Sequence, residues 1–249
     1  MGEKHIAYFR LVDACRHTGC PVCACLDEDS RRALSSLLHE SVTDVETRWR
    51  LRASWGLCNW HTWALLEGES VATGAAILYE DLLRVCQERL GRGAGGRPGW
   101  LTRLRRRVGI GRRTPAVAGS QLVAEYRGRA TCPVCASLRS AEAHYVATAV
   151  QFVEDPQFSR AYRGSSGLCL PHVVLAAEGA PDSATLATVL DTTLAKWQDL
   201  RHDLQRLVSK HEYRNTESIT RQEADSYARA FEVLAGRRHL FGTELHPAR

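Results

Sequence analysis

The sequence lacks the features that would indicate a membrane span, a secretory route or a β-sheet. No segment approaches the roughly 20 apolar residues that a membrane-spanning helix needs, although 44% of the residues are hydrophobic. Residues 1–15 contain no apolar run followed by a cleavage site, so we expect no secretory signal. No stretch alternates apolar and polar residues over the length of a strand. We therefore expect an all-α protein in the cytoplasm, where disulfides are uncommon.

Acidic residues are missing from one segment, residues 91–113, which contains eight arginines. Without these arginines, 25 basic residues face 28 acidic ones, which leaves a net charge of about −3 on the rest of the chain. This excludes a broad basic surface for nucleic acid outside the segment. The segment begins with a glycine-rich stretch and continues with apolar residues at helical spacing, so it is either a solvated linker or a basic amphipathic helix that binds an anionic surface or nucleic acid.

Cysteine and histidine, by contrast, recur in a repeated pattern. The motif Cys-Pro-Val-Cys occurs at 20–23 and 132–135, and the motif Gly-Leu-Cys-x-x-His occurs at 56–61 and 167–172. The first pair of motifs is offset by 112 residues and the second by 111. Six of the nine cysteines lie in these motifs, so the pattern predicts a duplicated metal-binding unit.

We predict that each repeat binds one metal ion through its own four residues. Three thiolates and one imidazole complete a tetrahedron and leave no open position, which is typical of a structural zinc site. Cys15, His17 and Cys25 have no counterpart in the second repeat, and Cys86 lies on an apolar helical stripe, so we exclude these side chains as ligands. The predicted Zn²⁺ sites are Cys20, Cys23, Cys58 and His61 in the first repeat, and Cys132, Cys135, Cys169 and His172 in the second.

The same ligands leave a second interpretation open. Three cysteines and one histidine also hold iron–sulfur clusters, and thiols at a helix N-terminus can be redox-active. In such a redox or sensor protein, Cys15, Cys25 or Cys86 would be available as resolving thiols. A brown colour after anaerobic purification would separate an iron–sulfur protein from a zinc protein.

Helical periodicity and capping residues predict the secondary structure. Asp44 and the pair Asp155-Pro156 stand at matching places in the two repeats and are typical of helix starts. We further expect a helix from about Ser30, a helix after each Cys-x-x-His, a long helix from Ser183, and a last helix that opens with the capping box Thr220-x-x-Glu223. The predicted organisation is a helical repeat at 1–90, a linker at 91–121, and a second repeat with C-terminal helices at 122–249.

At this level of detail the chain resembles an uncharacterised bacterial family, a domain of unknown function. The resemblance rests on the two pairs of Cys/His motifs, on Ile77-Leu78-Tyr79-Glu80-Asp81-Leu82-Leu83 and on Lys210-His211-Glu212-Tyr213-Arg214, and it covers roughly residues 15–90 and 122–236. It implies a helical fold with two Cys3His metal sites at the residues given above. It implies no activity.

Sequence alone favours a zinc-stabilised, non-enzymatic binding or adaptor protein with an unidentified protein partner. The four tryptophans at positions 49, 55, 60 and 63 either line a partner groove or, as is more common near a metal site, pack in the core. An enzyme stays open: acid–base candidates exist, but spacing supports no nucleophile–base pair among them. These candidates are Glu80, Asp81, Glu142, His144 and His211.

Overall fold

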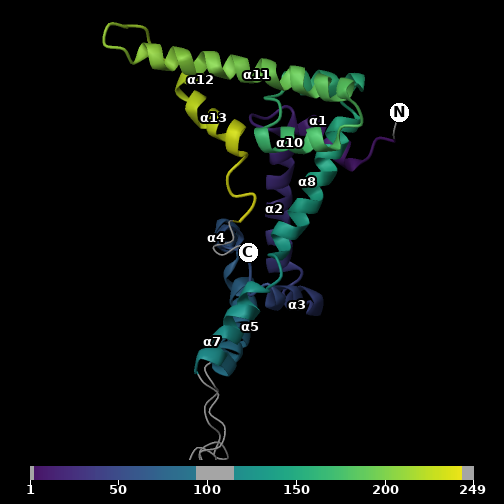
Figure 1. Ribbon diagram of the computed structural model, residues 1–249, viewed down its shortest axis with the longest axis vertical. Helices are drawn as coiled ribbons and strands as arrows, with labels where there is room; N and C mark the ends of the chain where they lie inside the picture. Colours follow the sequence, from purple (N-terminus) through teal and green to yellow (C-terminus); the bar gives the residue numbers. More distant parts are fainter. Residues whose placement is uncertain (1–2, 94–114, 243–249) are drawn as a thin grey trace, which may run out of the picture. The chain divides into compact units, whose positions relative to one another are not determined.

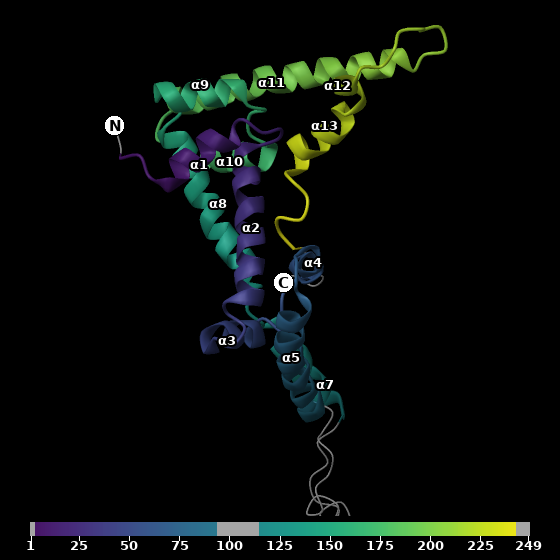
Figure 2. The same cartoon turned by 180° about the vertical axis from the view of Figure 1, so that it is seen from behind.

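A computed structural model describes residues 3–93 and 115–242. Within these two ranges the chain forms helices, turns and loops and contains no strand (Figures 1 and 2). This confirms the predicted all-α class. None of the described helices combines the length and the apolar character that a bilayer crossing requires. The arginine-rich segment lies outside the described residues except for 91–93, which end helix α5 (Ala72–Gly93).

Two compact units divide the chain, and they differ from the two sequence repeats. Unit 1 comprises residues 1–31 and 137–241, and unit 2 comprises residues 32–136 and 242–249. The helices that follow the two Cys-Pro-Val-Cys motifs, α2 (Pro21–His39) and α8 (Pro133–Gln151), each contribute residues to both units. The first of these begins well before Ser30, because the motif itself starts the helix with a proline, the residue best suited to the first helical position.

The helices of unit 1 pack around α11 (Ser183–Lys210), which begins where Asp182 accepts a hydrogen bond from the Thr185 amide. In Figures 1 and 2 the neighbouring helices lie along this long element. The Cys-x-x-His motif of residues 169–172 lies at the start of α10, which itself packs against α11. The other helices of unit 1 are α1 (Ile6–Ala14), α9 (Pro156–Gly164), α10 (Leu170–Gly179), α12 (Arg221–Ala224) and α13 (Ser226–Ala235).

Buried polar contacts fix helices α1 and α9 of unit 1. The predicted N-cap Asp155 accepts hydrogen bonds from the amides of Gln157 and Phe158, which confirms the predicted start of α9. The same carboxylate accepts a 2.6 Å hydrogen bond from the hydroxyl of Tyr8, which is fully buried on α1. On the other side of α9, the hydroxyls of Tyr162 and Thr193 lie 2.6 Å apart. Because the buried hydroxyls of Tyr8 and Tyr162 and the Asp155 carboxylate all have hydrogen-bond partners, their burial costs little desolvation free energy.

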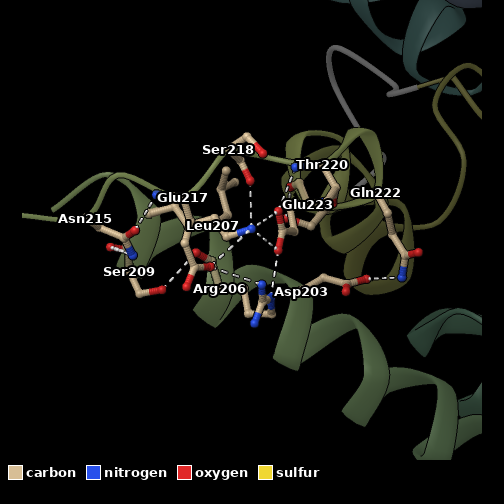
Figure 3. A network of polar contacts seen from close by, with 12 residues as sticks. Asp203, Arg206, Leu207, Ser209, Asn215, Glu217, Ser218, Thr220, Gln222 and Glu223 are labelled. Carbon is tan, nitrogen blue, oxygen red and sulfur yellow. Dashed lines mark hydrogen bonds and ion pairs between the residues drawn. The ribbon is translucent and has the colours of Figure 1, made fainter.

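A buried ion pair fixes the path of the chain after α11 (Figure 3). The ammonium group of Lys210 donates hydrogen bonds to both carboxylate oxygens of Glu223, at 2.9 and 2.8 Å, and to the Ser218 carbonyl at 2.8 Å. Arg206 donates to the same carboxylate at 2.7 Å. Glu223 also completes the predicted capping box with Thr220. These contacts hold the loop between α11 and α12 in place, so that the chain folds back and α13 packs against both α11 and α10.

Unit 2 contains the shorter helices α3 (Val45–Ala53) and α4 (Asn59–Ala64), the 3-10 turn η1 (Leu65–Glu67), α5 and α7 (Pro115–Arg127). Asp44 caps α3 through a 2.7 Å hydrogen bond from the Thr47 amide, as predicted. Helices α5 and α7 pack side by side in both views of the fold. Gly74 on α5 lies against the end of α2, where a Cβ atom would stand 2.3 Å from the Leu38 carbonyl oxygen. Only glycine permits this approach.

Asp81 links two helices of unit 2 and should make that unit sensitive to acid. Arg52 on α3 donates two 2.7 Å hydrogen bonds to this buried carboxylate, and Arg84 donates a third. These contacts lower the pKa of Asp81 to about 2. Because the folded pKa lies below the usual value near 4, the stabilisation is complete above that value and is lost as the pH falls toward 2.

We therefore expect Asp81→Asn to lower the melting temperature at pH 7 and to remove part of the acid sensitivity between about pH 4 and 2. Melting curves measured across this pH range provide the test. Asp225→Asn is a matched control, because Asp225 is exposed and its ion pair with Arg221 is long, at 3.8 Å. Equal melting curves for Asp81→Asn and wild type would contradict the expectation.

Candidate metal centres

Unit 1 brings four of the predicted ligands together at the starts of two helices. Cys20 immediately precedes α2 and Cys23 lies in its first turn, whereas Cys169 is the N-cap of α10 and His172 lies in the first turn of that helix. The Nδ1 atom of His172 lies 3.3, 3.5 and 3.1 Å from the sulfurs of Cys20, Cys23 and Cys169. All four side chains are buried. We call this group centre 1.

Unit 2 contains a second group of the same composition, which we call centre 2. Cys58 is the N-cap of α4 and His61 lies in its first turn, while Cys132 immediately precedes α8 and Cys135 lies in the first turn of that helix. The Nδ1 atom of His61 lies 3.1, 3.6 and 3.4 Å from the sulfurs of Cys58, Cys132 and Cys135. His61 is completely buried, and Cys58 is the one half-buried member of the group.

The predicted pairing of the motifs within each repeat is wrong. All eight predicted residues lie in the two groups, but each Cys-Pro-Val-Cys motif meets the Cys-x-x-His motif of the other repeat. The structure exchanges the Cys-x-x-His halves of the two predicted sets. The predicted sets are Cys20, Cys23, Cys58 with His61, and Cys132, Cys135, Cys169 with His172; in the structure Cys169 and His172 join Cys20 and Cys23, whereas Cys58 and His61 join Cys132 and Cys135. The spacing within a motif determines which residues can share an ion, whereas pairing between motifs depends on how α2 and α8 divide between the units, which local spacing does not encode.

The ligand distances in both groups fit one tetrahedral ion. A zinc–sulfur bond of about 2.3 Å places two sulfurs of a tetrahedron about 3.8 Å apart. The sulfurs of Cys23 and Cys169 lie 3.7 Å apart in centre 1, and those of Cys58 and Cys135 lie 3.6 Å apart in centre 2. All ligand atoms within a group lie within 4.8 Å of one another. The four side chains of each group are thus arranged to hold one metal ion.

The electrostatics of centre 1 show why a cation fits there. Burial would raise the pKa of the Cys20 thiol, but hydrogen bonds from Cys169, Cys23 and His172 lower it well below its usual value. The hydrogen bonds of Cys23 to its two sulfur neighbours raise the pKa of that thiol instead. Burial lowers the pKa of His172, but its contacts with Cys169, Cys20 and Glu142 outweigh this and raise it to about 12. A divalent cation bound between the three sulfurs would offset the repulsion between neighbouring thiolates.

The two centres differ at the second nitrogen of the histidine. His172 Nε2 lies 2.9 Å from the Glu142 carboxylate on α8. His61 Nε2 is buried, and among the described residues it has no hydrogen-bond partner. A carboxylate on the second nitrogen fixes the ring orientation and makes the metal-binding nitrogen more basic. From the sequence Glu142 is only an acid–base candidate, because its contact with His172 depends on how α8 packs against α10.

Glu142→Gln should therefore weaken metal binding at centre 1 and leave centre 2 unchanged. Loss of such a carboxylate typically costs roughly 10- to 100-fold in metal affinity. Competition with a chromophoric chelator measures the affinity of both centres in one titration. Glu178→Gln on α10, the helix that carries His172, is a suitable control because Glu178 is exposed. An unchanged titration for Glu142→Gln would show that the carboxylate does not support the ligand.

The cysteines excluded from the sequence pattern also lie outside both groups. Cys15 and Cys25 are buried in unit 1, and burial raises the pKa of each thiol to about 12. Both are thus protonated and weak nucleophiles near neutral pH. Cys86 on α5 is half-buried rather than fully buried. Burial therefore makes Cys15 and Cys25 poor resolving thiols.

The remaining acid–base candidates have structural contacts. Asp81 binds two arginines, as described above, and His144 stacks on His5 at 5.0 Å between ring centroids. His211 Nδ1 lies 2.8 Å from the Leu207 carbonyl oxygen and so gives this carbonyl, near the end of α11, a hydrogen-bond partner. Glu80 lies on the exposed side of α5. No nucleophile–base pair emerges from these candidates in the described part of the chain.

A cavity of about 200 Å³ adjoins centre 1. Its wall includes the metal-site residues Cys20 and Cys169, together with Lys196 and Asp199 of α11 and Glu232 of α13. Asp203 closes another side, where it accepts hydrogen bonds from Gln222 and Arg229. The cavity therefore lies beside two of the three cysteine ligands of centre 1.

Comparison with known proteins adds a family but no activity. A family model described as "Family of unknown function (DUF6062)" matches residues 1–240. No curated protein and no solved structure matches the chain. The resemblance noted from the Cys/His motifs is thereby confirmed.

Proposed function

Since the chain belongs to DUF6062, a family of unknown function, we propose its role from the two centres: a zinc-stabilised, non-enzymatic binding or adaptor protein. The observation that carries the proposal is the composition and closeness of each group, three sulfurs and one imidazole nitrogen within 4.8 Å. Four protein ligands complete a zinc tetrahedron, so no coordination position remains for a substrate or a catalytic water.

The same closeness favours one ion over a cluster. An iron–sulfur cluster distributes its protein ligands over two or four iron atoms, which spreads those ligands more widely than a single ion does. Sulfur–sulfur distances of 3.6 and 3.7 Å instead match neighbouring corners of one tetrahedron. Sulfur-rich tetrahedral sites favour zinc among the common divalent metals.

Metal analysis of anaerobically purified protein tests the proposal. We expect about two zinc ions per chain and no visible absorption. Iron with inorganic sulfide and a brown colour would replace the zinc proposal with the iron–sulfur alternative. The absence of any bound metal would contradict both.

Exposed aromatic side chains in unit 2 support a protein partner. The side chains of Trp49 and Trp63 are each 62% exposed, so the interpretation of these two residues as core is wrong. Leu66 beside Trp63 is 64% exposed as well. Large exposed aromatics are enriched at protein interfaces, where they bury much apolar area at low entropic cost.

The partner proposal predicts that Trp49→Ala with Trp63→Ala keeps the metal content and melting temperature but weakens capture of the partner. Quantitative affinity purification that compares this variant with wild type is the measurement. Leu194→Ala in unit 1 is the control, since Leu194 is 54% exposed but lies on another surface helix. Equal recovery of all proteins by the three chains would contradict the role of the tryptophans.

A thiol redox role is the second candidate, and the cavity beside centre 1 is the observation that favours it. Cys20 and Cys169 form part of its wall, and a thiolate must be accessible to react. We expect zinc loss from centre 1 on mild treatment with hydrogen peroxide if this role holds. Retention of both metal ions under such treatment would exclude it.

A further inference from the structure

Gly242, near the end of the described chain, lies directly on centre 2. A Cβ atom at this position would stand 2.3 Å from the Cys58 sulfur and 2.6 Å from the Cys58 Cβ. It would also lie 3.5 Å from Trp60 Cδ1. Contacts below 3 Å between such atoms are incompatible with normal packing, so every residue except glycine would have to displace the chain or the ligand.

The backbone of Gly242 also makes a favourable contact with the centre. Its N–H group is a backbone donor to the sulfur of Cys135. Donors to a ligand atom help to hold that ligand in its orientation. Gly242 therefore touches two of the four ligands of centre 2, one through close packing and one through a hydrogen bond.

Six residues earlier, Gly236 lies beside centre 1. It ends α13 with a φ angle of +76°, a left-handed conformation that glycine adopts without strain. A Cβ atom here would lie 3.9 Å from the sulfurs of Cys23 and Cys169 and 3.9 Å from a ring carbon of Pro171. The chain thus leaves α13 close to the ligands of centre 1, at a distance that one added Cβ atom would span.

Between the two glycines the chain is anchored to unit 1. Arg237 lies 3.5 Å from the Asp27 carboxylate on α2, and Leu240 is only 4% exposed. A segment that is held in this way does not behave as a free terminus. The position of Gly236 is in turn fixed by α13, which the buried Lys210–Glu223 pair directs onto α10.

We propose that residues 236–242 form a strap that belongs to both metal centres, covers ligand sulfurs at each, and sets the rate at which the metal ions are released. The proposal rests on metal binding at the two centres, as put forward above. The strap is a backbone segment that lies beside the centres without supplying a metal ligand, so it is distinct from the two sets of four ligands. One end of the segment, Gly236, lies near the ligands of centre 1, and the other end, Gly242, lies directly on Cys58 of centre 2.

Metal release from the purified, loaded protein into an excess of chromophoric chelator tests the strap. Gly242→Ala should accelerate release from centre 2 by roughly 10-fold or more, by the magnitude typical for groups that support metal ligands. Glu142→Gln accelerates release from centre 1 and so identifies the kinetic phase of that centre. Gly91→Ala is the matched control in unit 2, because a Cβ atom at Gly91 meets nothing within 4 Å.

Two further variants separate the strap from a local clash. A chain that ends at Phe241 removes the N–H donor without adding an atom, and it should accelerate the same phase as Gly242→Ala. Leu240→Ala weakens the anchor in the middle of the segment and should accelerate both phases. Melting curves and circular dichroism show whether each variant is folded before release is measured.

The outcomes are distinct. If wild type binds no metal, the proposed function fails. If wild type binds two ions but Gly242→Ala and the chain ending at Phe241 release them at the wild-type rate, metal binding stands and the strap is overturned. If Gly242→Ala accelerates only the phase assigned by Glu142→Gln, the assignment of Gly242 to centre 2 is overturned.

Discussion

The double variant Cys20→Ser with Cys169→Ser should retain one metal ion per chain, whereas Cys20→Ser with Cys58→Ser should retain none. In the first pair both substitutions fall in centre 1, so centre 2 keeps all its ligands. In the second pair each centre loses one sulfur. Metal content by mass spectrometry, after removal of loosely bound ions, distinguishes one, two and zero ions per chain.

Pairing within each repeat makes the opposite prediction for the same two variants. Cys20 and Cys58 would then share one ion, and Cys20 with Cys169 would disable both sites. A double variant of cysteines outside the centres, Cys15→Ser with Cys86→Ser, controls for the loss of two thiols and should keep both ions. One ion in the Cys20/Cys58 variant and none in the Cys20/Cys169 variant would contradict the arrangement described above.

Loss of a single ligand should unfold one unit selectively. Structural zinc contributes folding free energy on the order of 10 kcal/mol, which is comparable to the whole stability of a domain. Cys169→Ser should therefore remove hydrogen-exchange protection from residues 3–31 and 137–241 of unit 1. Cys58→Ser should remove protection from the described residues of unit 2 instead.

Peptide-resolved hydrogen exchange measures both effects in the same experiment. The informative peptides lie in the first half of α2 and in α1, because they belong to the first repeat but to unit 1. Cys169→Ser, a change in the second repeat, should deprotect them. If these peptides stay protected while all peptides after residue 122 exchange rapidly, the repeats and not the units are the cooperative elements.

Local features of the fold were predictable from sequence because they depend on nearby residues. Asp44 and Asp155 cap helices, and Thr220 with Glu223 forms a capping box, as their spacing indicated. The predicted last helix is interrupted at Asp225, where α12 ends and α13 begins. The residue sets of the Cys/His motifs were also identifiable, since ligand spacing within one turn is a local property.

The partners of those motifs were not predictable in the same way. Whether Cys20 meets His61 or His172 depends on how helices far apart in sequence pack, and both choices satisfy the same tetrahedral chemistry. Gly242 illustrates the same limit: nothing in its sequence neighbourhood indicates a close contact with Cys58, which lies more than 180 residues earlier. Glu142 likewise gains its role only when α8 and α10 are packed.

The exchange of motifs between repeats has a consequence for the order in which the chain would complete its two candidate metal centres. Centre 2 is complete once Cys135 has been synthesised, whereas centre 1 waits for His172, and the loop that centre 1 closes encloses all of centre 2. A single repeat contains only two of the four ligands of each centre, so it cannot complete either centre. Two repeats are therefore the smallest number that completes a centre. Their fusion in one chain keeps the second repeat at a fixed effective concentration, whereas a dimer of separate repeats would dissociate on dilution.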